Sequence, residues 1–399
     1  MSRPLRRTRR DLLVTGVLAA LAVAAVTGVA VTAPTNGSQL HPATSSVATD
    51  PLAAPPTALT EAFTLSDAEL PGQHRPLTVA GLLITTDGFT VRAHDPAGDE
   101  AWRYERDREI CAVGTAWHQV TIAYRGPAGC GDVVAIDAQT GQYDSTRSAI
   151  AGEQVVPVES NDRFGILSPE RVELWRSDLV RTVEYGAVEA KQEPASQPNE
   201  DCTLTSALTR TESLVTTEAC PDGTWLRFQA TTPEDSRTPE LLGEIAVADE
   251  SRLVAIGQEA AAVYSPGPEP QLLSYDPDGT LLESRDVAPA AEPSGLDAPA
   301  TADLPHHMSW FDGERLYLLG PTRLQVSQVF EDAIGTGVAV GESFLYPTAD
   351  GIAVADPDTG ETHTTLPVTR GTGAVSLSLA GGTIVEKRGA QVVGLVQAP

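Results

Sequence analysis

The chain has 399 residues and a formal net charge of −27, and 41% of its residues are hydrophobic. Residues 1–33 carry five Arg and one Asp, a net charge of +4, so residues 34–399 carry −31. Such an acidic body lacks the Lys and Arg needed to contact nucleic-acid phosphates, and anionic lipid surfaces repel it. The apolar fraction is sufficient for a sizeable core, which excludes global disorder.

The N-terminus predicts a membrane anchor. Residues 12–33 form an uncharged apolar run of 22 residues, and about 20 such residues in a helix span a bilayer. Five arginines precede the run, so the positive-inside rule makes residues 1–11 a cytoplasmic basic tail and places the rest of the chain outside. We therefore expect a single-pass protein of the cell membrane with an extracytoplasmic body.

Two other interpretations of this segment stay open. A signal peptide cleaved after Val31-Thr32-Ala33 would release a secreted protein, although Pro34 is a poor residue to follow a cleavage site. The segment Thr8–Leu13 contains paired arginines and is similar to a twin-arginine export signal.

Residues 34–73 are rich in Pro, Ala and Thr and show no persistent apolar period. This composition predicts a flexible stalk between the membrane and a folded domain at residues 74–399. Asn36-Gly37-Ser38 fits the glycosylation sequon, which is weak evidence when it occurs once.

The four cysteines lie in the exported part of the chain, where an even count indicates disulfides. Of the three possible pairings we favour Cys111–Cys130 and Cys202–Cys220, because each pair encloses a similar unit of three short strands. In both units the first Cys is expected to open the first strand and the second Cys the third strand. A Cys₄ zinc site is the alternative, but its ligands are usually two to four residues apart.

The body contains a repeat in which a short apolar run is followed by Asp and then by a turn that ends in Gly. Asp caps such a turn with its side chain, and Gly accepts the positive φ that the turn requires. The Asp positions indicate a period of about 43 residues. The four clear copies are Asp95 with Gly98, Asp137 with Gly141, Asp276 with Gly279, and Asp356 with Gly360.

Weaker copies fill the gaps, and they follow the segments Arg171–Trp175, Trp225–Phe228 and Arg323–Val329. A last meander over 375–396 lacks a fourth strand, which a segment near Phe63–Leu65 or Pro76–Ala80 would supply. Four short strands per period of this length are typical of a β-propeller blade. We expect an all-β propeller with eight blades, with seven blades or a β-solenoid as alternatives.

The segments Ala135–Gly141 and Ala355–Gly360 resemble the repeat of quinoprotein-type propellers, the pyrroloquinoline-quinone-like repeat proteins, in which Ala-x-Asp-x-x-Thr-Gly precedes a docking Trp. Trp102 follows Gly98 in this way, whereas Ser145 and Thr364 stand in the Trp position of the other copies. The chain also resembles the membrane-anchored propellers of actinobacteria, and 25 Arg against two Lys suit a GC-rich genome. The resemblance implies the fold and, in its enzymes, a calcium ion and a quinone beside two adjacent cysteines, a pair that this sequence lacks.

The sequence predicts no catalytic, cofactor-binding or metal-ligating residues. His306-His307 is read as a loop pair, and the Asp-Pro-Asp sequences are read as turns. We therefore favour a non-catalytic scaffold that binds an envelope protein or a glycan, without cofactor. The alternative is a quinoprotein-like oxidoreductase or another propeller enzyme. Two insertions, Glu189–Asp201 and Ala288–Pro305, are the candidate binding loops.

Overall fold

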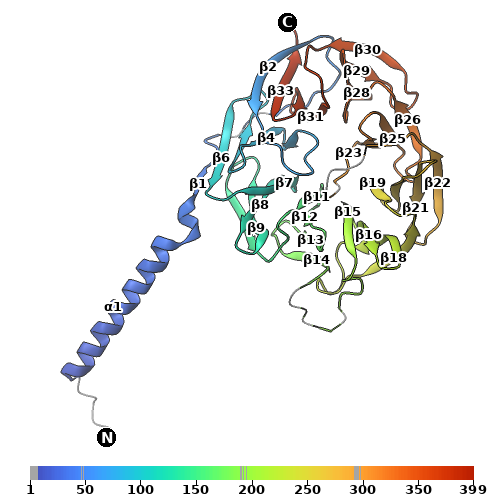
Figure 1. Cartoon of the computed structure of the whole chain (residues 1–399). Coiled ribbons are helices and arrows are strands. Elements are labelled where there is room, and N and C mark those ends of the chain that lie inside the picture. Colours follow the sequence, from blue (N-terminus) through green and yellow to red (C-terminus); the bar gives the residue numbers. More distant parts are fainter. Residues whose placement is uncertain are drawn as a thin grey trace.

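The computed structural model describes residues 8–399 except 46, 48, 189, 190, 192, 195, 292–295 and 297. Within these residues, one N-terminal helix precedes a ring of eight antiparallel sheets (Figure 1). The prediction of an eight-bladed β-propeller is confirmed. We number the blades 1 to 8 in the order in which their innermost strands follow along the chain.

The helix α1 spans Arg9–Thr32 and is long and apolar enough to cross a membrane. It begins three residues before the predicted start because Thr8 and Asp11 form a capping box. The Thr8 backbone N–H donates to the Asp11 carboxylate at 2.8 Å, and the Asp11 N–H donates to the Thr8 hydroxyl at 3.2 Å. The paired arginines Arg9 and Arg10 therefore lie in the first turn of the helix.

Each blade has four strands that run from the central channel to the rim, and blade 1 has a fifth, β1 (Ser38–His41). The innermost strands are β3 (Leu77–Val79), β7 (Ile110–Ala116), β11 (Val156–Ser160), β15 (Thr203–Arg210), β19 (Arg252–Ile256), β23 (Thr301–Asp303), β27 (Val338–Val340) and β31 (Ser376–Ala380). The second strands are β4 (Leu82–Thr86), β8 (Gln119–Gly126), β12 (Arg163–Leu167), β16 (Ser213–Cys220), β20 (Ala261–Ser265), β24 (Met308–Phe311), β28 (Ser343–Thr348) and β32 (Thr383–Arg388).

The outer half of each blade completes the ring. The third strands are β5 (Thr90–His94), β9 (Gly129–Asp137), β13 (Arg171–Trp175), β17 (Gly223–Ala230), β21 (Gln271–Tyr275), β25 (Leu316–Leu319), β29 (Gly351–Ala355) and β33 (Gln391–Gln397). The outermost strands are β6 (Glu100–Arg106), β10 (Tyr143–Ser148), β14 (Arg181–Gly186), β18 (Leu241–Val247), β22 (Leu281–Asp286), β26 (Val326–Phe330), β30 (Thr362–Pro367) and β2 (Leu59–Ser66).

Burial explains why the repeat is visible in the sequence. Inner strands such as β4 and β20 are buried at every position, since both faces of a blade pack against neighbouring blades. The outermost strand β18 alternates between half-buried and exposed positions, and β30 is mostly exposed. The core is a series of layers between blades, each built from two adjacent sheets.

The prediction of a flexible stalk over residues 34–73 is wrong for two of its segments. The strand β1 pairs with β6 of blade 1, where Leu40 lies opposite Tyr104 and packs on the core. The strand β2 pairs with β33 and supplies the fourth strand of blade 8, as the segment near Phe63–Leu65 was expected to do. The composition of this region is Pro-rich, but its few apolar side chains are enough to hold it against the ring. The propeller therefore begins at β1 rather than at residue 74.

A buried ion pair lies where the ring closes. Lys387 of β32 contacts the carboxylate of Asp67, and both side chains are almost fully buried. Asp67 also accepts a hydrogen bond from the Thr86 N–H of blade 1 at 3.0 Å. The residue that follows β2 thus links the last blade to the first.

One weak copy of the repeat was assigned to the wrong strand. The segment Arg323–Val329 was expected to precede the repeat turn, but it contains the start of the outermost strand, β26. The third strand of blade 6 is β25, and the turn that follows it runs from Gly320 to Gln325. Gly320 occupies the position of the repeat's Asp, so the sequence carries no turn signal there.

Candidate functional site

The four clear repeat turns join the third strand to the outermost strand in blades 1, 2, 5 and 7. In each turn the Asp carboxylate accepts hydrogen bonds from backbone N–H groups two to four residues later. The distances are 2.9 Å for Asp95–Ala97, 2.7 Å for Asp137–Thr140, 2.7 Å for Asp276–Thr280 and 2.8 Å for Asp356–Thr359. The glycines Gly98, Gly141, Gly279 and Gly360 have φ values of 91°, 65°, 83° and 74°. These carboxylates are occupied in shaping the turns.

Trp102 shows how a repeat turn joins two blades. Its ring, on β6 of blade 1, lies against Gly141 of blade 2, where a Cβ would stand 2.5 Å from Cγ of the indole. Its Nε1–H donates to the carbonyl of Ala138 at 2.6 Å. The turn glycine is therefore required by a close approach from the preceding blade as well as by its positive φ.

Other side chains fill the equivalent place at two further turns. Phe63 of β2 lies against Gly98, where a Cβ would be 2.6 Å from its ring. Gln328 of β26 lies against Gly360 and donates to the carbonyl of Asp358 at 2.6 Å. The docking Trp of the quinoprotein repeat is thus replaced by Phe or Gln, which hides the motif from a search for Trp.

The structure contains both disulfides with the favoured pairing. Cys111 of β7 is joined to Cys130 of β9, and their Cα atoms are 6.0 Å apart. These are the first and third strands of blade 2, as expected. Pairing of β7 with β8 shifts register between Ile110 and Ala112, and pairing of β8 with β9 shifts between Tyr124 and Gly126. These irregularities bring the two cysteines together across the intervening strand.

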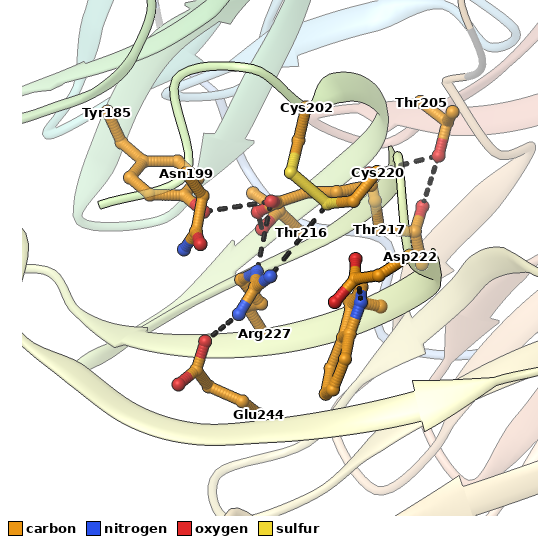
Figure 2. The surroundings of a disulfide bond; sticks show 12 residues. Tyr185, Asn199, Cys202, Thr205, Thr216, Thr217, Cys220, Asp222, Arg227 and Glu244 are labelled. Atoms are coloured by element: carbon orange, nitrogen blue, oxygen red, sulfur yellow. Dashed lines mark hydrogen bonds and ion pairs between the residues drawn. A yellow bond between two sulfur atoms is a disulfide. The ribbon is translucent and has the colours of Figure 1, made fainter. Parts of the chain in front are cut away.

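The second disulfide differs from its expected geometry. Cys202 lies just before β15, but Cys220 ends β16 rather than opening β17. The disulfide therefore joins neighbouring strands, and its Cα atoms are 4.3 Å apart (Figure 2). Cys220 pairs with Gly223 across the two-residue turn Pro221-Asp222, so it ends the second strand just before the third strand begins.

A buried network of charged and polar groups lies beside this disulfide (Figure 2). The Glu218 carboxylate of β16 is fully buried and accepts hydrogen bonds from Arg227 Nε at 3.0 Å and the Tyr185 hydroxyl at 2.8 Å. The Thr216 hydroxyl donates to its other oxygen at 2.7 Å. Arg227 is also paired with Glu244 of β18. Since Tyr185 belongs to β14, the network connects blades 3 and 4.

Burial raises the pKa of Glu218, while the hydrogen bonds from Thr216 and Tyr185 and the charge of Arg227 act in the opposite direction. Burial together with the Glu218 charge raises the pKa of Tyr185, which keeps its hydroxyl protonated as a donor. Sequence reasoning missed this network. The available signal was a Glu inside the apolar strand Ser213–Cys220.

Cys202, Glu218 and Cys220 place potential metal-ligand atoms close together. Both sulfurs are bonded to each other in the disulfide, so neither can act as a thiolate ligand. The cluster is structural.

A hollow with a volume of about 1020 Å³ lies between blades 4 and 5. The Cys202–Cys220 disulfide forms part of its wall through Cys220, and Ala219 is exposed within it. Tyr264 of β20 lines the other side, and Asp249 and Glu250 are exposed acids among its lining residues. Its apolar lining also includes the prolines Pro169, Pro266, Pro270 and Pro289.

Both predicted insertions connect an outermost strand to the next innermost strand, and the second one lines this hollow through Pro289, Ala290 and Leu296. Residues 189, 190, 192 and 195 of the first insertion and 292–295 and 297 of the second lie outside the described residues. In the first, Gln197 is buried and its amide donates to the carbonyl of Glu184 at 2.9 Å. In the second, the Ala290 N–H donates to the Tyr264 hydroxyl at 3.0 Å, and Leu296 lines the hollow.

A smaller cavity of about 220 Å³ lies in the central channel and contains ionisable groups. Glu159 of β11 accepts a hydrogen bond from the Thr115 N–H at 2.8 Å. Burial raises its pKa, and the charge of Arg75 opposes that shift. Asp303 of β23 pairs with Arg210 of β15 at 3.0 Å, and burial raises its pKa too. The inner strands were recognised in the sequence. These ionisable side chains lie close together in the channel only because the eight blades close into a ring.

Within this channel His74 and the second insertion are in contact. A ring nitrogen of His74 lies 2.5 Å from the carbonyl of Ala298, and burial lowers the pKa of His74. The histidines predicted to lie in a loop, His306 and His307, fall between β23 and β24.

The fold and its sites define the chain as an eight-bladed β-propeller with an N-terminal apolar helix. No family model matches the sequence, and no curated protein matches it. Among solved structures, the chain is similar to BamB from Moraxella catarrhalis, with a TM-score of 0.52 and 13% identity over 85% of this chain and 100% of that one. It is also similar to the computationally designed protein Ika8, with a TM-score of 0.51 and 14% identity over 84% of this chain and 99% of that one. These likenesses support the propeller fold and leave the activity to be argued from the site.

Proposed function

We propose that this protein is a membrane-anchored propeller whose body lies outside the cytoplasmic membrane and binds a protein of the cell envelope without catalysing a reaction. The anchor is α1, and the arginines before it favour a cytoplasmic N-terminus. The two disulfides support an oxidising location for the body. The abundance of Arg over Lys further supports a place among the membrane-anchored propellers of actinobacteria.

The hollow between blades 4 and 5 is the observation that carries the binding role. Its volume of about 1020 Å³ lies at the upper end of the range for binding pockets, about 1,000 Å³, and offers room for a segment of a larger partner. Proline and tyrosine side chains offer rigid apolar surface, which costs little conformational entropy on binding. The acids Asp249 and Glu250 favour a partner segment that carries basic side chains.

The architecture around the hollow supports a preformed site. One wall is fixed by the Cys202–Cys220 disulfide and by the Glu218–Arg227 network behind it. A wall held in this way does not need to be ordered when a partner binds, which preserves affinity. The site is therefore positioned by the rigid blade, and Pro289, Ala290 and Leu296 of the second insertion add to its lining.

Proximity labelling from the full-length chain on intact cells tests this proposal. Ala219→Trp places a large side chain in the hollow, and Ala246→Trp is its matched control at an exposed position on β18 of the same blade. We expect a small set of envelope proteins that is lost with Ala219→Trp and kept with Ala246→Trp. Identical sets for both variants, with both folded and exported, would contradict a protein-binding role of the hollow.

A further inference from the structure

The link between α1 and blade 1 is short and structured. The helix ends at Thr32, and β1 begins at Ser38 after the 3₁₀ turn η1 (Pro34–Gly37). The Asn36 side-chain amide donates to the carbonyls of Ala30 at 2.7 Å and Val31 at 3.1 Å, two orphan acceptors of the last helical turn. The sequon asparagine therefore caps the helix and is not a free glycan acceptor.

This link is bonded directly to blade 1. The carbonyl of Gly37 accepts a hydrogen bond from the Asp107 N–H at 2.8 Å, and Ser38 starts the ladder of β1 with β6 opposite Arg106. Figure 1 shows α1 projecting from the outer edge of blade 1, away from the ring. The end of the membrane-spanning helix and the rim of the propeller are consequently neighbours.

An exposed aromatic side chain lies at this junction. Phe89 stands in the turn between β4 and β5, and 51% of its surface is exposed. It lines a shallow hollow of about 320 Å³ together with Asn36 and Gly37 of the link. The turn itself is shaped by Asp87, whose carboxylate accepts the N–H groups of Phe89 at 3.0 Å and Thr90 at 2.7 Å. The turn therefore does not depend on the aromatic ring, and folding does not explain why the Phe89 side chain is exposed.

We propose that Phe89 and the link rest in the interfacial layer of the phospholipid bilayer, so that the rim of blade 1 contacts the membrane. This inference rests on the anchor in the proposed function. Five residues in a compact turn extend about 10 Å, so a link that leaves the hydrocarbon core at the end of α1 is still close to the lipid headgroups. Aromatic rings are favoured in that layer.

The contact is apolar rather than electrostatic. Glu105, Arg106 and Asp107 line the same shallow hollow, and Arg106 is paired with Asp132. Because the body is also acidic overall, anionic headgroups do not attract this surface. Because the propeller touches the bilayer only at its rim, both faces of the propeller stay open. The hollow between blades 4 and 5 then remains accessible to a partner outside the membrane.

Depth measurement by electron paramagnetic resonance tests the inference on the full-length chain in phosphatidylcholine vesicles. Phe89→Cys carries a nitroxide label, and Leu281→Cys on β22 is the control because Leu281 is similarly exposed, at 49%, on the far side of the ring (Figure 1). We expect the label at 89 to collide more with oxygen and less with a water-soluble nickel complex than the label at 281. This difference should persist in high salt, since the contact is apolar.

The experiment distinguishes a failure of the rim contact from a failure of the anchor. If the chain stays with the vesicles but the two labels are equally accessible to nickel, the rim contact is wrong and the anchor stands. If the chain does not stay with the vesicles, the anchor is wrong and the inference falls with it. Phe89→Trp provides an independent check, because its emission should be quenched by lipids that carry a quencher in the interfacial layer, whereas that of Leu281→Trp should not.

Discussion

Blades 1 and 4 are stabilised by different means. Blade 1 keeps the repeat turn with Asp95 and Gly98, and its Trp102 docks on the turn of blade 2. Blade 4 lacks that turn and has a longer connection between β17 and β18. It has instead the Cys202–Cys220 disulfide and the buried Glu218–Arg227 pair.

The difference teaches that blades of one ring with the same topology can be stabilised by different chemistry. In blade 1 apolar burial and one hydrogen bond join neighbouring blades. In blade 4 a disulfide and a buried ion pair join strands of the same blade, and the Tyr185 hydroxyl links this pair to blade 3. Cys220 of the disulfide also lines the hollow. The proposed binding site therefore adjoins a blade that lacks the clear repeat turn.

The largest expected effect is the loss of the docking ring in blade 1. Trp102→Ala should lower the free energy of unfolding by about 3–5 kcal/mol, because it removes a side chain that is 1% exposed and leaves a cavity between two blades. Urea denaturation followed by circular dichroism measures the loss. Trp225→Ala is the control, since Trp225 is half-exposed, and it should cost clearly less. Equal losses would mean that docking at the turn does not stabilise the ring.

The next effect breaks the buried pair of blade 4. Arg227→Met should cost about 3 kcal/mol, because the Glu218 carboxylate stays buried without its cation. Adding Glu218→Gln should recover much of this loss, since the uncompensated charge disappears. The two urea titrations form the measurement. A double variant as unstable as Arg227→Met alone would contradict the electrostatic origin of the effect.

The two disulfides allow blades 2 and 4 to be compared directly. Replacing Cys202 and Cys220 by Ser should lower the free energy of unfolding by about 3 kcal/mol, and replacing Cys111 and Cys130 should cost the same within error. Their sequence separations of 18 and 19 residues make the entropic contributions equal. Only the first replacement should also loosen the hollow, which amide hydrogen exchange in β15 and β16 would detect. Unchanged hydrogen exchange in β15 and β16 would contradict a role of the disulfide in stabilising the hollow.

The smallest effect concerns pH and the central channel. Burial raises the pKa of Glu159 above its ordinary value of 4.5, so the folded chain binds more protons than the unfolded chain just above that pH. The contribution of Glu159 to the free energy of unfolding therefore falls as pH rises through this window. Glu159→Gln should remove that slope, while its amide oxygen can still accept from Thr115. Denaturation midpoints between pH 4 and pH 8 provide the test, and parallel pH profiles would contradict it.

The fold was predictable from the sequence where local chemistry repeats. The turn carboxylates, the turn glycines and the buried inner strands produce a visible period, and the last meander signalled a missing strand near Phe63–Leu65. The stalk prediction failed because composition describes an average, whereas a few apolar residues such as Leu40 and Phe63 fix a strand through contacts made elsewhere in the chain. The turn after β25 was missed because Gly320 replaces the expected Asp.

The candidate site was much less predictable. The spacing of Cys202 and Cys220 indicated a disulfide, but not that it would wall a hollow. The hollow is built from the ends of strands in two blades and from loops far apart in the sequence, so its shape exists only after the ring has closed. The partners of Glu218 come from two blades in the same way.

Photo-crosslinking from the hollow tests the binding role most directly. A benzoylphenylalanine placed at residue 219 of the full-length chain should capture one discrete envelope partner in intact cells, and the same probe at residue 246 should not. That pair of results would establish the hollow as the contact surface. No crosslinked partner from residue 219, or the same products from both positions, would contradict the account.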